Sequence, residues 1–338
     1  MTPRPSDRVL TGQRLMVGFD GTHLDADLKY LISDIGVAGI ILFKKNIQTP
    51  EQIRELTRSV QEYAASCGKD PLFIAVDQEG GEVARLRGPF FTEFPGNPHI
   101  QDSADAHRFA EVTASELRSI GINMNMAPVL DVVPDGIHSV MAGRSFGNDP
   151  FRVSELGQVV ISLFQRNGVL SVVKHFPGMG RAVKDPHIDP IDLRISLPEM
   201  EACDLKPFKD AVEAGVSGIM LSHLVYSGID PDWPASLSEV IAKDLLQHRM
   251  GFAGIVLTDD LDMGAIESHY PVETLAERIL EAQIDIALVC HRTEKIEAFF
   301  ESVLKAIGKS PRIRQSGVAA CRKITEVKRT LLNAPISQ

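Results

Sequence analysis

The stretch SVVKHF (residues 171–176) is a short, mainly apolar run with a lysine and a histidine near its end. Seven other segments are of strand length and nearly continuously apolar: LMVGFD (15–20), GIILF (39–43), LFIAVD (72–77), NMNMAPVLD (123–131), GIMLSH (218–223), GIVLTD (254–259) and DIALVC (285–290). An antiparallel strand with one face in water would alternate apolar and polar residues. The unbroken runs therefore predict parallel strands that are covered on both faces.

Amphipathic segments lie between these runs. Apolar residues recur at the three- and four-residue spacing of helices in residues 50–65, 104–120, 152–166, 197–214 and 272–283. These five are the clearest of the helical segments, and with the eight strand segments they indicate eight repeats of strand then helix. This pattern predicts an α/β fold, a single (β/α)8 TIM-type barrel over residues 1–338, with closing helices at about 293–333. An open, doubly wound sheet is the alternative arrangement.

The composition excludes several classes of protein. With 44% apolar and 24% charged residues over 338 positions, the chain has enough apolar side chains to bury a large core. Its net charge of −10 disfavours nucleic acid and acidic membrane surfaces as partners. The four cysteines stand singly, and the N-terminal apolar run is only of strand length. We therefore expect no zinc site, no disulfide framework and a cytoplasmic location.

Polar residues follow the predicted strands at the point where each strand ends. The carboxyl ends of barrel strands form the active-site face, so such residues converge there. A single polar strand end carries little information, but several together predict an acidic pocket that contains histidine. The strand ends concerned are Asp20, Asp77, Asp131, Lys174–His175, His223 and Thr258–Asp259–Asp260.

Two segments carry the residue types needed for acid–base and nucleophilic chemistry. KHFPGMGRAVKDPHIDP (174–190) is predicted to be a long loop in which Asp185 orients His187 and stabilises its cationic form. GIVLTDDLDM (254–263) delivers Asp259 and Asp260 at a strand tip, where neighbours point to different sides. One is therefore expected to face the pocket, and the other to support the following loop or cap the next helix. A carboxylate with a histidine on another loop suits glycosyl transfer by a covalent route.

The order and spacing of several motifs resemble glycoside hydrolase family 3, specifically its bacterial single-domain β-N-acetylhexosaminidases of cell-wall recycling. The resemblance runs along the whole chain. Its motifs are GIILFKKN (39–46), VDQEGGEVARLRGPFF (76–91), GINMNMAPVLDV (121–132), GRSFGNDP (143–150), KHFPGMG with DPH (174–187), IMLSHLVYSGID (219–230), PASLS (234–238) and GFAGIVLTDDLDM (251–263).

The resemblance implies a role for each matching residue. The family's nucleophile corresponds to Asp259, and its acid/base is a histidine paired with an aspartate, here His187 with Asp185. The implied reaction is retaining release of terminal β-linked N-acetylglucosamine from peptidoglycan fragments, with a small carbohydrate as substrate and no cofactor or metal. The implied sugar-binding residues are Asp77, Arg85, Arg144, Lys174 and His175.

The chain departs from the family pattern at Met179, Pro186 and Glu82, where the family usually has His, Ser and Arg. Met179 removes a polar contact from the loop, and Glu82 adds an anion that we expect near Asp77. Two other functions stay open: a sugar-binding relative without turnover, and a metal-dependent barrel hydrolase. The ligands available to the latter are Asp185, His187, Asp189, His223, Asp259 and Asp260. The sequence leaves the oligomeric state open.

Overall fold

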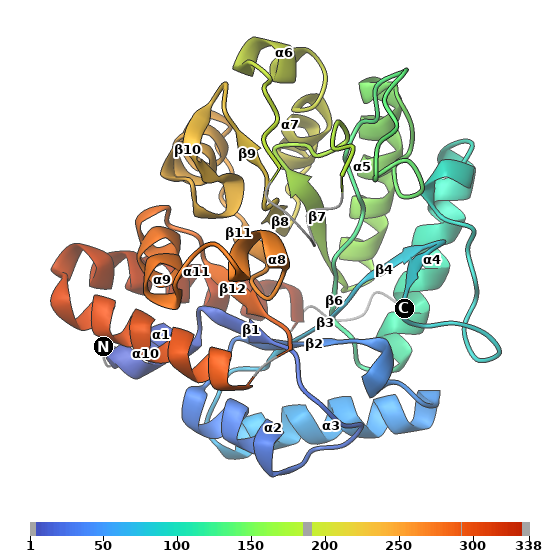
Figure 1. The fold of residues 1–338 in the computed structure, drawn as a ribbon. Helices are drawn as coiled ribbons and strands as arrows, with labels where there is room; N and C mark the ends of the chain where they lie inside the picture. The colour runs from blue at the N-terminus through green and yellow to red at the C-terminus, as the bar shows by residue number, and fades with distance from the viewer. Residues whose placement is uncertain (1–4, 185–190, 292, 333–338) are drawn as a thin grey trace.

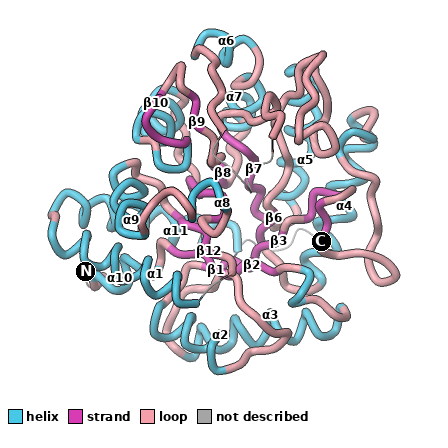
Figure 2. The backbone as a smooth tube through the Cα atoms, viewed as in Figure 1, coloured by secondary structure: helices cyan, strands magenta, loops and turns pink. Residues whose placement is uncertain are grey.

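A closed barrel of parallel strands forms the centre of the computed structural model, which describes residues 5–184, 191–291 and 293–332 (Figures 1 and 2). The strands follow the order β1-β12-β11-β8-β7-β6-β3-β2 around the barrel. Each predicted segment overlaps one of them, so the predicted (β/α)8 barrel is confirmed. The strands are β1 (Leu15–Val17), β2 (Gly39–Leu42), β3 (Phe73–Val76), β6 (Met124–Asn125), β7 (Leu170–Phe176), β8 (Gly218–Leu221), β11 (Ile255–Asp260) and β12 (Ile286–Val289).

Helices surround the barrel (Figure 1). Two antiparallel hairpins extend from its loops, β4 (Gln78–Gly80) with β5 (Val83–Ala84), and β9 (Val225–Tyr226) with β10 (Asp230–Pro234). The helices are α1 (Asp7–Gly12), α2 (Ala26–Tyr30), η1 (Leu31–Ile35), α3 (Pro50–Ser66), α4 (Ser103–Ser119), α5 (Pro150–Arg166), α6 (Leu197–Ala202), α7 (Lys206–Glu213), η5 (Val240–Arg249), α8 (Gly264–Glu267), α9 (Val272–Glu281), α10 (Thr293–Lys309) and α11 (Pro311–Leu332). Short 3₁₀ turns are η2 (Lys44–Asn46), η3 (Asn97–His99) and η4 (Ala235–Leu237).

Local sequence determines where these helices begin and end. Thr49 and Asp149 accept hydrogen bonds from the first turns of α3 and α5, and each is followed by proline, which suits that position because its missing N–H needs no partner. The prediction of one helix over 197–214 is wrong: α6 ends at Ala202 and α7 begins at Lys206. Pro207 lies in the first turn of α7, whereas in a continuous helix it would break the backbone hydrogen bonding.

Alternate residues of the strands face two different cores. Met16 and Phe73 belong to the core inside the barrel, whereas Leu15 and Ile74 pack toward the surrounding helices. Helix α11 contributes Ile324 to the inner core, and its Lys328 lies 5.0 Å from the ring centroid of Phe73, the first residue of β3. Helix α11 therefore covers the N-terminal end of the barrel.

Among the described residues, no helix is both long enough and apolar enough to cross a membrane.

Candidate active site

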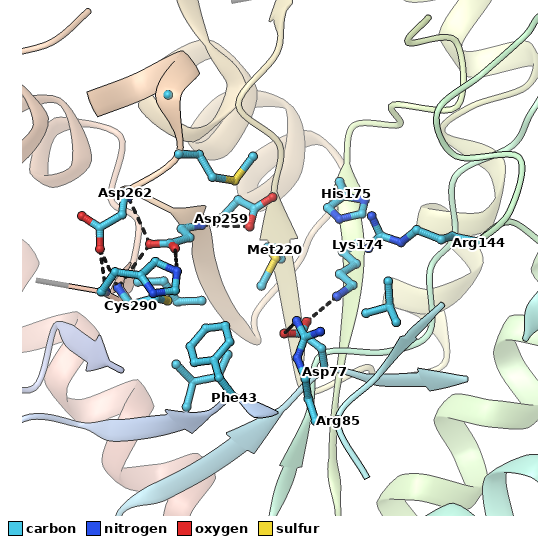
Figure 3. A pocket seen from close by; sticks show the side chains of 17 residues that line it. Phe43, Asp77, Arg85, Arg144, Lys174, His175, Met220, Asp259, Asp262 and Cys290 are labelled. Atoms are coloured by element: carbon cyan, nitrogen blue, oxygen red, sulfur yellow. Dashed lines mark hydrogen bonds and ion pairs between the residues drawn. The ribbon is translucent and has the colours of Figure 1, made fainter. Parts of the chain in front are cut away.

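A pocket of about 360 Å³ lies at the carboxyl ends of the strands, a volume within the usual range of roughly 300–1,000 Å³ for small-molecule sites. Figure 3 shows Lys174, His175 and Arg144 on one side of it and Asp259 on the other. Apolar residues of the inner core, including Ile41, Met220 and Leu288, also line it. All five predicted sugar-binding residues line the same pocket as Asp259: Asp77, Arg85, Arg144, Lys174 and His175.

Irregular strand pairing brings consecutive residues to the pocket. The register of β7 against β8 shifts between Val173 and Phe176, so Lys174 and His175 both reach the pocket wall. The register of β11 against β12 shifts in the same way between Leu257 and Asp260. Asp259 and Asp260 both line the pocket, so the expectation that only one of them would face it is wrong. The expectation that one of them supports the following loop is confirmed for Asp260, which binds the backbone N–H of Asp262.

The Asp77 carboxylate lies between two cations. Its Oδ1 accepts a hydrogen bond from Lys174 Nζ at 2.7 Å, and its Oδ2 accepts one from Arg85 Nη2 at 3.1 Å. Burial alone would raise the pKa of Asp77, but Lys174 and Arg85 lower it to about 2. Asp77 is therefore an ionised acceptor that fixes two donors beside the pocket.

Glu79, which was not predicted from the sequence, binds Arg144, a further cation of this wall. Its Oε1 lies 2.7 Å from both Lys174 Nζ and Arg144 Nη2, and its Oε2 accepts from Arg144 Nε at 2.9 Å. Burial raises the pKa of Glu79, but Lys174 and Arg144 outweigh this effect and lower it. The sequence did contain a signal for Glu79: it lies two residues after Asp77, and alternate residues of an extended chain point to the same side.

His175 is held from behind by a buried carboxylate. Its Nδ1 lies 2.7 Å from Asp131 Oδ2, and Asp131 Oδ1 accepts a hydrogen bond from the backbone N–H of Met179 at 2.8 Å. Asp131 is fully buried. A carboxylate in this position fixes the orientation of the imidazole ring, so Asp131 acts on the pocket through His175.

The two aspartates of β11 have different partners. Asp259 Oδ1 accepts from the Asp260 backbone N–H at 2.8 Å. Burial raises the pKa of Asp259, but His223, His175 and this N–H outweigh it, and the pKa is lowered. Asp260 instead binds the next loops, because its Oδ1 accepts from the backbone N–H groups of Asp262 at 3.0 Å and Cys290 at 3.2 Å. Its Oδ2 lies 3.2 Å from His291 Nε2. This contact raises the pKa of His291, and it outweighs burial, which lowers that pKa.

Other strand-end residues lie away from the pocket wall. The expectation that Asp20 belongs to the pocket is wrong: it is exposed and binds Lys45 at 2.6 Å on the surface. Buried His223 contacts Ser236 Oγ at 2.7 Å through Nδ1 and the Asp260 carbonyl oxygen at 2.9 Å through Nε2. Asp185, Pro186, His187 and Asp189 lie outside the described residues. In the described part of the chain, no three His, Cys, Asp or Glu side chains are arranged to hold a metal ion.

The model of a known protein family, the glycosyl hydrolase family 3 N terminal domain, matches residues 9–325. The chain belongs to glycosyl hydrolase family 3. The chain is 34% identical over 299 residues to a beta-hexosaminidase of Nitrosomonas eutropha, and the match covers 86% of this chain and 84% of the relative. A beta-hexosaminidase of Thiobacillus denitrificans is 37% identical over 290 residues, with 83% and 79% covered.

Solved family 3 structures share the fold. A beta-N-acetylglucosaminidase from Paenibacillus sp. str. FPU-7 superimposes with a TM-score of 0.90 at 34% identity, and the match covers 98% of this chain and 64% of that one. A beta-N-acetylhexosaminidase from Beutenbergia cavernae gives 0.88 at 28% identity, with 96% and 98% covered. NagZ from Neisseria gonorrhoeae, solved with N-trifluoroacetyl-D-glucosamine, gives 0.75 at 29% identity, with 93% and 98% covered.

Met179 and Glu82, two of the positions at which the sequence was expected to depart from the family pattern, do not line the pocket. Met179 is only 4% exposed and packs in the outer core, while its backbone N–H binds Asp131. Glu82 is exposed in the turn between β4 and β5. Its carboxylate lies beside Gly143, where the Cβ of any larger residue would come within 3.2 Å of Glu82 Oε1. Glu82 does not line the pocket. Asp77 accepts hydrogen bonds from Lys174 and Arg85.

A buried ion pair at the base of the loop after β7 gives a prediction for this family 3 chain. Asp204 is fully buried, and its two oxygens accept from Arg181 Nε at 3.2 and 3.1 Å. Burial raises the pKa of Asp204 to about 6, despite Arg181. Because the folded pKa exceeds the unfolded value, the contribution of Asp204 to stability is complete below about pH 4 and is lost as the pH rises through 6.

We expect Asp204→Asn to remove this pH dependence. As the pH rises from 4 to 7.5, wild type should lose the contribution of Asp204, whereas Asp204→Asn has no such contribution to lose. The free energy of unfolding of the variant minus that of wild type should therefore increase by up to about 3 kcal/mol. Thermal or urea unfolding at the two pH values measures the change, and the constant effect of losing the Arg181 contact cancels in the difference. Asp232→Asn, at an exposed site, is the control. A difference that does not change with pH would contradict the prediction.

Proposed function

We propose that this chain is a retaining β-N-acetylhexosaminidase that releases terminal β-linked N-acetylglucosamine through a covalent intermediate on Asp259. The observation that carries the proposal is the position of Asp259. Its carboxylate, with a lowered pKa, lines a pocket whose other wall holds Lys174, Arg85 and Arg144. The beta-hexosaminidase and beta-N-acetylglucosaminidase relatives support the same activity.

In the proposed reaction, Asp259 attacks the anomeric carbon as the bond to the leaving oxygen breaks, and His187 donates its proton to that oxygen. Water then attacks the anomeric carbon, gives its proton to His187 and releases Asp259. Asp185 stabilises the protonated form of His187. Because the pKa of a free histidine is near 6.5, the same ring serves as acid and then as base at neutral pH.

The cationic wall is proposed to bind the sugar substituents. Asp77 accepts from sugar hydroxyls, while Arg85, Arg144, Lys174 and His175 donate to hydroxyls and to the acetamido group. We propose fragments of peptidoglycan as the source of the substrate. The four cysteines are free thiols, which supports the proposed cytoplasmic location.

Comparison of two substrates tests this activity. Replacing the 2-acetamido group by hydroxyl in the same aryl glycoside is expected to lower kcat/KM by roughly 10²–10⁴, because the pocket donors lose their acceptor. The measurement is steady-state kinetics on the aryl N-acetyl-β-glucosaminide and the matching aryl β-glucoside. Similar kcat/KM values for the two substrates would refute the proposal.

A further inference from the structure

The buried wall of the pocket forms a chain of alternating charges. Arg85 binds Asp77, Asp77 binds Lys174, Lys174 binds Glu79, and Glu79 binds Arg144, with contacts of 2.7–3.1 Å. The side chains of Lys174 and Glu79 are only 3% and 2% exposed, so solvent screens their contact weakly. Glu79 links Lys174 to Arg144 in this series of ion pairs, although it does not line the pocket itself.

The contacts of Glu79 restrict both of its cationic partners. Two parallel N–H bonds from Nε and Nη2 fix the plane of the Arg144 guanidinium group. Its Nη1 lies 3.8 Å from Met141 Sδ. Lys174 has three ammonium donors, and its contacts with Asp77 and Glu79 leave one of them for another acceptor.

We propose that Glu79 is a positioning residue that sets where Lys174 and Arg144 present their remaining donors to the bound sugar. The proposal rests on the proposed function, because it takes these two cations as sugar-binding groups. Glu79 acts through them and does not touch the sugar. Without the Glu79 carboxylate, the Arg144 guanidinium group would no longer be held in one plane. Lys174 would lose one of its two anionic contacts and keep only Asp77.

Other contacts maintain the local fold, which separates positioning from a structural role. The β4–β5 hairpin is held by Gln78, whose Oε1 accepts from the backbone N–H groups of Arg85 at 2.9 Å and Leu86 at 3.0 Å. The Gln78 backbone is in turn bonded to the Asn125 side chain at 2.9 and 3.0 Å. The backbone of Arg144 is held by Asn97 Nδ2, which donates to its carbonyl oxygen at 2.9 Å. The Glu79→Gln variant is therefore expected to fold.

Glu79→Gln keeps the shape of the side chain and removes its charge. We expect KM for an aryl N-acetyl-β-glucosaminide, and the Kd for free N-acetylglucosamine measured by calorimetry, to rise about 10–100-fold. We expect kcat to fall less than about fivefold and the pH–rate profile to keep its shape, because Glu79 exchanges no proton in the reaction. Glu82→Gln removes an exposed carboxylate from the same hairpin and should stay within about twofold of wild type.

A double-mutant cycle identifies the route of the effect. If Glu79 acts partly through Arg144, the double variant Glu79→Gln/Arg144→Met should lose less affinity for N-acetylglucosamine than the two single variants together. The fold-change in its Kd should be well below the product of the two single fold-changes. Losses that multiply fully would overturn the proposal. So would a Glu79→Gln variant that fails to fold while Glu82→Gln folds, since the role of Glu79 would then be structural.

The two hypotheses fail differently in the binding measurement. Wild-type protein that does not bind N-acetylglucosamine contradicts the proposed function and the positioning role with it. Wild-type binding that Glu79→Gln leaves unchanged contradicts only the role of Glu79.

Discussion

Asp259→Ala is expected to abolish turnover of every glycoside, with a loss of at least about 10⁴-fold in kcat, because the variant lacks the group that forms the covalent intermediate. Asp260→Ala should retain measurable activity if it folds. The contacts of Asp260 with the backbone of Asp262 and Cys290 support the loops, whereas Asp259 is the proposed nucleophile. Steady-state kinetics on the two purified variants measures this contrast.

Trapping identifies the attacking carboxylate directly. A 2-deoxy-2-fluoro or 5-fluoro glycoside should label wild-type protein, and mass spectrometry of the digest should place the label on Asp259. A label on Asp260 would overturn the assignment. Asp259→Ala is the control and should take up no label.

His187→Ala is expected to have an effect that depends on the leaving group. Turnover of a natural disaccharide should fall by roughly 10²–10⁴, because an alkoxide needs a proton as it leaves. For an activated aryl glycoside, kcat/KM should fall much less. Because the second step still lacks its base, the aryl substrate should show a burst followed by slow turnover that azide accelerates. Asp185→Ala should show a weaker form of the same pattern.

Pre-steady-state and steady-state rates on the two substrates test this assignment. Equal losses on both substrates, with no burst and no acceleration by azide, would mean that His187 binds substrate or positions its loop. The acid/base would then have to be sought among Asp189, His175 and His223.

The barrel was predictable from sequence because its strands are buried on both faces, and continuous apolar runs such as GIILF report that burial directly. The start of α3 at Pro50 was predicted correctly, whereas α5 begins at Pro150, two residues before the predicted 152. The break between α6 and α7 was not predicted, since the apolar periodicity continues through it. A single Pro207 outweighed that periodicity.

The site was predictable where a residue's position at a strand end was itself the signal. Lys174 and Asp77 follow this rule, but their contact joins residues 97 positions apart, which no local pattern reveals. Glu79 was not predicted, and Asp131 was predicted only as one of several strand ends, because the importance of both lies in the side chains they hold. The register shift in β11 was also unpredictable, since it depends on pairing with the neighbouring strand β12.

Helix α11 covers the N-terminal end of the barrel, and this determines the order in which substrate and products can enter and leave the pocket. Because Ile324 and the inner core fill the space beneath the pocket, the described residues leave the mouth as the route for both entry and exit. Under the proposed function, only the end of a glycan chain can enter. The sugar that binds deepest is then the last to leave, after the aglycone has gone and water has replaced it. Free N-acetylglucosamine should consequently compete with substrate for the emptied site.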